Sequence, residues 1–152
     1  MDIRIRAEKS SMNIHLYILI CLLIFYAVFY MASTVCAGFL RIEHFDWTIP
    51  FRHRIVPSLK SSEYLVQVIS AEVTFFCSGL LFVPVVGSRV WDYSATVTFL
   101  HIIICCIVTQ EFPGMWQWWL QIGCGLPLMI ASGQTLAYFT YRNSYQRHRT
   151  TL

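Results

Sequence analysis

Two ionisable side chains lie inside long runs that otherwise carry no charge. Glu72 lies in the run from residue 64 to 87, and His101 in the run from 93 to 110. A charged group at the centre of a membrane helix costs at least about 2.5 kcal/mol, so both side chains are expected to face protein rather than lipid. A carboxyl and an imidazole can exchange protons with each other or with a substrate.

The depth of these two residues predicts that they form an intramembrane polar pair. At 1.5 Å per residue, each lies about 12 Å into its run. Because consecutive spans run in opposite directions, their heights in a hydrocarbon core of about 30 Å differ by about 6 Å. Glu72 and His101 are therefore expected to meet directly or through a polar neighbour. Two interpretations remain open: a proton-linked site in a small membrane carrier, or a buried hydrogen bond that sets helix register.

Polar and small residues in the run from residue 93 to 110, which is the third apolar run of the chain, recur on one helix face. Ser94, Thr98, His101 and Cys105 follow one another at steps of 4, 3 and 4 residues, as expected for one side of an α-helix. Such residues are common where membrane helices pack against each other. The pattern predicts that this face points into a bundle.

Aromatic and acidic residues mark the ends of the third run. Asp92 precedes the run, where its carboxylate is expected to cap the helix and meet the positive end of its dipole. A contact with a partner is the alternative role for this carboxylate. Tryptophan and tyrosine side chains are typical of the two membrane interfaces. The residues assigned to these belts are Trp91 and Tyr93 at one end and Trp116, Trp118 and Trp119 at the other.

No residue pattern of an enzyme, cofactor or metal site occurs in the sequence. It lacks a Ser/His/Asp set, paired catalytic carboxylates, a phosphate-binding glycine loop and a C-x-x-C pair, so no catalytic, cofactor-binding or metal-binding residue is assigned. The six cysteines all lie in apolar runs and are expected to pack as thiols, with palmitoylation as the alternative. A net charge of +3 is too small to indicate nucleic-acid binding.

The elements that must position these residues are membrane spans. Hydrophobic residues make up 57% of the 152 and charged residues only 12%, about half the charged fraction of a soluble protein. The fold expected is all-α, a polytopic four-helix transmembrane bundle with spans at about 16–40, 64–87, 93–110 and 116–141. The polar segments are a head (1–15), a loop (41–63) and a basic tail (142–152).

Four spans would place both termini on one side of the membrane. The head, the turn at Arg89 and the tail hold seven of the eleven Lys and Arg residues. The positive-inside rule therefore favours cytosolic termini. The same architecture suits a purely structural subunit of a larger membrane complex, and the oligomeric state is not fixed by the sequence.

The order of motif residues resembles that of the Sys-type Golgi trafficking membrane proteins. The resemblance covers roughly residues 17–140, and one branch of that family is similar over residues 72–86, 90–93 and 111–113. The motif residues are Asp92, Tyr93, Thr96, His101, Phe112, Pro113, Trp118 and Trp119.

The resemblance implies a non-enzymatic protein of the Golgi and trans-Golgi network that acts in vesicle-mediated protein transport, including Golgi-to-endosome transport. It also implies docking of an Arf-related small GTPase. Sys-type members tend to carry a basic turn after the second span, whereas residues 84–89 here hold the single charge of Arg89.

Overall fold

The computed structural model describes residues 2–41, 48–51 and 61–150, and within them it contains helices and turns but no strand. The long helices are α1 (Asp2–Phe39), α2 (Ser62–Val86), α3 (Val90–Thr109) and α4 (Trp116–Thr150). Two 3₁₀ turns, η1 (Ile49–Phe51) and η2 (Gly87–Arg89), lie between them. The fold is thus all-α, as the sequence predicts. Most of the loop assigned to residues 41–63 lies outside the described residues.

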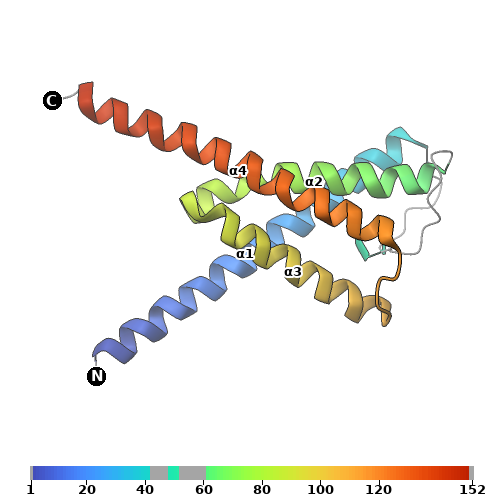
Figure 1. Cartoon of the computed structure of the whole chain (residues 1–152), viewed down its shortest axis with the longest axis horizontal. Helices are drawn as coiled ribbons and strands as arrows, with labels where there is room; N and C mark the ends of the chain where they lie inside the picture. The colour runs from blue at the N-terminus through green and yellow to red at the C-terminus, as the bar shows by residue number, and fades with distance from the viewer. Residues whose placement is uncertain (1, 42–47, 52–60, 151–152) are drawn as a thin grey trace.

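Three helical stretches are long and apolar enough to cross a membrane, namely Asn13–Phe39, Ser62–Thr109 and Trp116–Arg142. In such runs the backbone must satisfy its own hydrogen bonds, which only a continuous helix does within a single segment. The middle stretch has 48 residues, about 72 Å if it were straight. It instead folds back at η2 into α2 and α3 (Figure 1).

Residues with a positive φ lie at or just beyond the ends of three of the helices. Gly87 has a φ of 67° just after α2, and Gln110 has a φ of 52° just after α3. Arg41, two residues beyond α1, has the same φ of 52°. Gln110 has the left-handed helical conformation that commonly ends a helix, and the backbone N–H of Gly87 donates to the carbonyl oxygen of Val83. At Gly87 a side chain would also meet the hydroxyl of Tyr141, so glycine fits this turn sterically as well.

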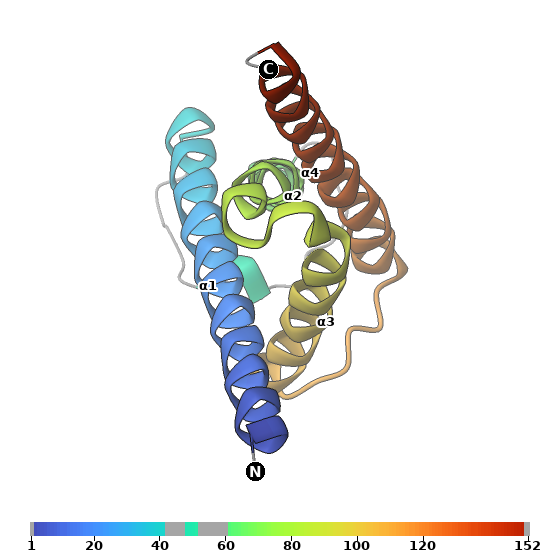
Figure 2. The ribbon, with the colours of Figure 1, turned by 90° about the vertical axis from the view of Figure 1, so that its left-hand side faces the viewer.

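The four long helices run alternately back and forth, and both termini lie at the same end of the molecule (Figure 1). Viewed from that end, α2 lies between α1 and α4 (Figure 2). Its buried residues form two adjacent stripes: Val66, Gln67, Ser70, Ala71, Thr74, Phe75, Ser78, Gly79, Phe82 and Val83. One stripe can thus face each neighbour, which makes α2 the central helix.

All four helices contribute to one apolar core. It contains Phe25 and Phe29 of α1, Phe75 and Phe82 of α2, Val90 and Val97 of α3, and Met129 and Ala137 of α4. A smaller cluster, Cys105, Trp118 and Ile122, joins α3 to α4 next to η1. His101 lies where the core and this cluster meet.

Glycines let α4 approach α2 closely. A Cβ at Gly133 would stand 2.6 Å from the carbonyl oxygen of Gly79, and one at Gly79 would collide with the carbonyl oxygen of Met129. In the same interface the Ser132 hydroxyl donates to the Phe76 carbonyl oxygen at 3.1 Å. Small residues commonly allow such contacts between membrane helices.

Candidate functional site

His101 of α3 is almost fully buried, with 3% of its surface exposed. Its Nδ1 lies 3.0 Å from the hydroxyl of Tyr26 on α1. The rings of Phe25 and Phe29 lie beside the imidazole, with centroids 5.2 and 6.3 Å away. The residues 25, 26 and 29 lie on one side of a helix because they are one and four positions apart. The imidazole therefore packs against three aromatic side chains of α1, of which only Tyr26 has a group that can form a hydrogen bond with it.

Cys105 lies one helical turn after His101 and contacts the same imidazole. Its Sγ is 3.6 Å from Nε2 of His101 and 3.9 Å from the carbonyl oxygen of Pro50. A thiol is a weak donor and a weak acceptor. Nε2 therefore has a much weaker protein partner than Nδ1.

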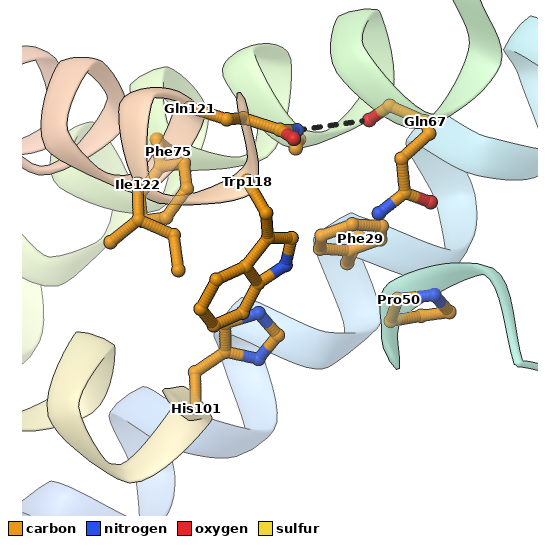
Figure 3. A pocket seen from close by; sticks show the side chains of 9 residues that line it. Phe29, Pro50, Gln67, Phe75, His101, Trp118, Gln121 and Ile122 are labelled. Carbon is orange, nitrogen blue, oxygen red and sulfur yellow. Dashed lines mark hydrogen bonds between the residues drawn. The ribbon is translucent and has the colours of Figure 1, made fainter. Parts of the chain in front are cut away.

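A small cavity opens beside the imidazole and is lined by η1 and all four helices (Figure 3). The space that it leaves for a water-sized body is about 10 Å³. Above it, the side-chain amide of Gln121 on α4 donates to the backbone carbonyl oxygen of Gln67 on α2 at 3.3 Å. The lining residues are Phe29, Pro50, Gln67, Ala71, Phe75, His101, Trp118, Gln121 and Ile122.

The face predicted for the third span is confirmed. Ser94, Thr98, His101 and Cys105 are all buried in α3. Bundle packing explains the four positions, because residues 99, 103 and 107, at other positions around the same helix, are exposed. Both the step pattern and the preference for small or polar types were visible in the sequence.

The structure does not join the two residues of the predicted polar pair. Glu72 is only half-buried, on the flank of α2 beside its two buried stripes. Among the described residues, no hydrogen bond or ion pair links it to His101, whose short polar contact is with Tyr26. Similar depth in the membrane does not place two side chains on facing sides of their helices.

The predicted cap at Asp92 is wrong. α3 begins at Val90, with Arg89 at the N-cap and no side-chain capping hydrogen bond. Asp92 is exposed in the first turn, and its backbone carbonyl oxygen accepts a hydrogen bond from Thr96 at 2.9 Å. The turn η2 continues directly into α3 without an extended residue. The helix therefore begins at Val90, so Asp92 lies within the first turn and not at the N-cap position.

The belt assignment of Trp118 is also wrong. Trp116 is 68% exposed and Trp119 38%, but only 5% of Trp118 is exposed. Trp118 packs on Cys105 and Ile122 because the first turn of α4 turns this position toward α3. Trp91, at the other end of α3, is 58% exposed, in keeping with a place at the interface.

The family-motif residues gather at three places. Asp92, Tyr93 and Thr96 lie in the first two turns of α3, and His101 and Trp118 line the cavity. Phe112 and Pro113 lie in the turn between α3 and α4, and the indole of Trp119, in the first turn of α4, donates to the Pro113 carbonyl oxygen at 2.9 Å. The Phe112 and Trp119 rings lie 5.8 Å apart.

Three polar residues of the cavity region were not singled out from the sequence. Tyr26, Gln67 and Gln121 each lie in an apolar run. Gln67 had a usable signal, since it precedes Ser70, Thr74 and Ser78 at helical spacing on the buried face of α2.

Comparison with known proteins places this fold in a family. Residues 6–146 match the SYS1 family, described as integral membrane protein S linking to the trans Golgi network. The chain belongs to the SYS1 family. SYS1 proteins are Golgi-associated integral membrane proteins and are not an enzyme family. The chain is thus a multi-pass integral membrane protein, as its apolar helices also indicate.

A human relative identifies the branch that the sequence resembles. Transmembrane protein 244 of Homo sapiens is 35% identical over 123 residues, which cover 81% of this chain and 95% of the relative. The similarity therefore extends over almost the whole relative. No solved structure matches this chain.

Proposed function

We propose that this protein is a four-span membrane protein of the Golgi and trans-Golgi network that docks an Arf-related small GTPase in vesicle-mediated protein traffic. The observation that carries the proposal is the match of residues 6–146 to the SYS1 family, whose description names a link to the trans-Golgi network. A docking role needs no catalytic group in the protein itself.

The hairpin of α2 and α3 supports four crossings. α3 has 20 residues, so it is about 30 Å long, enough for the hydrocarbon core alone. Exposed aromatic residues lie at its two ends, with Trp91 in the first turn of α3 and Phe112 just beyond the last turn. With α2 and α3 crossing separately, both termini emerge on one side of the bilayer.

The end of the molecule that carries the termini is the docking surface in this proposal. Arg89 on η2 and Arg142 near the end of the apolar part of α4 are exposed there. The excess of basic residues in the segments at this end favours the cytosol, where small GTPases act. Arg89 is the one charge of the turn, so its removal tests that turn specifically.

The first experiment follows the full-length protein in cells. The protein should co-localise with trans-Golgi markers and retain an Arf-related GTPase in a pull-down from mild detergent. Plasma-membrane staining, together with no such GTPase in the pull-down, would overturn the proposal.

A matched pair of variants then locates the docking surface. Arg89→Gln should reduce GTPase recovery, because it removes the charge of the turn. Thr135→Gln, at an exposed position within the membrane stretch of α4, should leave recovery unchanged. Equal recovery with both variants would assign docking to another surface.

A further inference from the structure

We propose that the cavity beside His101 is a binding site for one structural water, held by the ring nitrogens of His101 and Trp118 and by the side-chain oxygen of Gln121. The inference does not depend on the proposed role in traffic. It rests on the polar groups that face this cavity and on its size.

The indole of Trp118 supplies the first polar group. Only 5% of this residue is exposed, and its Nε1–H makes no hydrogen bond with any group in the described part of the chain. The indole N–H group of a buried tryptophan usually has a hydrogen-bond partner. Figure 3 shows this indole between the imidazole of His101 and the amide of Gln121.

The imidazole supplies the second group. The contact of 3.0 Å between Nδ1 and the Tyr26 hydroxyl allows either group to donate, and we assign the donor role to Tyr26. Nε2 then carries the ring proton and becomes a donor. Its recorded polar contact is the Cys105 sulfur at 3.6 Å, a weak acceptor. Two ring N–H groups on different helices thus need an oxygen acceptor in the same space.

A water molecule matches this pattern in hydrogen bonds and in volume. Its oxygen accepts from the two ring N–H groups, and its hydrogens can go to the side-chain oxygen of Gln121 and the carbonyl oxygen of Pro50. A buried water typically makes two to four such bonds and needs roughly 10–15 Å³. The space of about 10 Å³ matches the requirement of one water.

The direct test is a structure of the full chain in lipid nanodiscs at a resolution that resolves ordered water. A density peak is expected at about 2.7–3.2 Å from both Nε2 of His101 and Nε1 of Trp118. Continuous side-chain density across this space, or a cavity with no peak, would overturn the proposal.

Solid-state NMR of the same sample tests the site in a second way. Magnetisation should pass from water to the Nε2–H of His101, and Ala71→Val, which fills the cavity from α2, should abolish that transfer. Ala137→Val, at another buried alanine of the core, should leave it intact. Transfer that persists in Ala71→Val, or that is lost in both variants, contradicts the site.

A second pair of variants covers the case in which Ala71→Val does not fold. Gln121 and Gln134 both lie on α4 and both donate to a backbone carbonyl oxygen at 3.3 Å, that of Gln67 and that of Ser88. Gln121→Leu removes the acceptor beside the cavity and should weaken the transfer to His101. Gln134→Leu removes an equivalent hydrogen bond elsewhere and should not; equal effects would overturn the proposal.

Discussion

The hydroxyl of Tyr26 lies 3.0 Å from Nδ1 of His101, although 75 residues separate them in the chain. This contact joins α1 to α3 inside the apolar core. Because membrane helices gain little from the hydrophobic effect when they associate, such a polar contact helps to fix their relative position.

Tyr26→Phe should therefore destabilise the folded protein. The variant keeps the ring packing but removes the partner of Nδ1 in a buried imidazole. A loss of about 0.5–2 kcal/mol is expected for a buried interhelical hydrogen bond. Thermal unfolding in detergent measures it. Tyr17→Phe, at an exposed position of the same helix, is the control, and equal stability of the two variants would contradict the role of Tyr26.

Gly133→Ala should destabilise the contact between α2 and α4. The new methyl group would meet Val90 and the Gly79 carbonyl oxygen, and overpacking of this kind costs about 1–3 kcal/mol. Gly123→Ala lies on the same helix with nothing within 4 Å of the new methyl group. It should be neutral or stabilising by up to about 1 kcal/mol, since alanine favours the helix. A chemical or thermal unfolding series that ranks the two variants in the opposite order would refute this packing.

Trp118→Ala should cost far more stability than Trp116→Ala. Trp118 is 5% exposed and packs in the cluster with Cys105 and Ile122, whereas Trp116 is 68% exposed. Removing a buried tryptophan costs about 3–5 kcal/mol, and removing an exposed one about 0.5 kcal/mol or less. The measurement compares the unfolding midpoints of the two variants in one detergent. Similar midpoints would contradict the buried position of Trp118 and support its assignment to the membrane interface.

Cysteine accessibility tests the number of crossings. Ser88 and Gly114 are exposed and lie in the turns at opposite ends of α3. If α3 crosses the membrane alone, Ser88→Cys and Gly114→Cys should react with an impermeant thiol reagent from opposite sides of sealed vesicles. The unsubstituted chain gives the background of the six native cysteines. Labelling of both from one side would show that α3 does not cross.

Helix type and the inward face of α3 could be predicted from the sequence, because both follow from periodicity. Ser94, Thr98, His101 and Cys105 repeat at helical spacing. This spacing and the polar or small type of the four residues are enough to predict which face of the helix is buried. The start of α3 could not be placed so well. Whether Arg89 or a later residue precedes the first turn depends on the backbone of η2, which leaves no mark in the residue types.

The partner of His101 could not be predicted in the same way. Depth along the helix favoured Glu72, but the rotation of α2 about its axis directs Gln67 and Ala71, rather than Glu72, at the cavity. That rotation is set by close contacts such as Gly79 with Met129. Only the packed structure contains this information, and for the same reason a buried Trp118 could not be distinguished from its exposed neighbours.

α1 and α4 continue as helices from the apolar bundle to Asp2 and Thr150. The polar extensions are about 17 Å and 12 Å long, and they diverge at the shared end (Figure 1). Each extension has no flexible joint to the span below it. A change of helix tilt in a thicker or thinner bilayer would therefore alter the separation of the two chain ends, so a donor and acceptor dye placed there would report bilayer thickness as energy transfer.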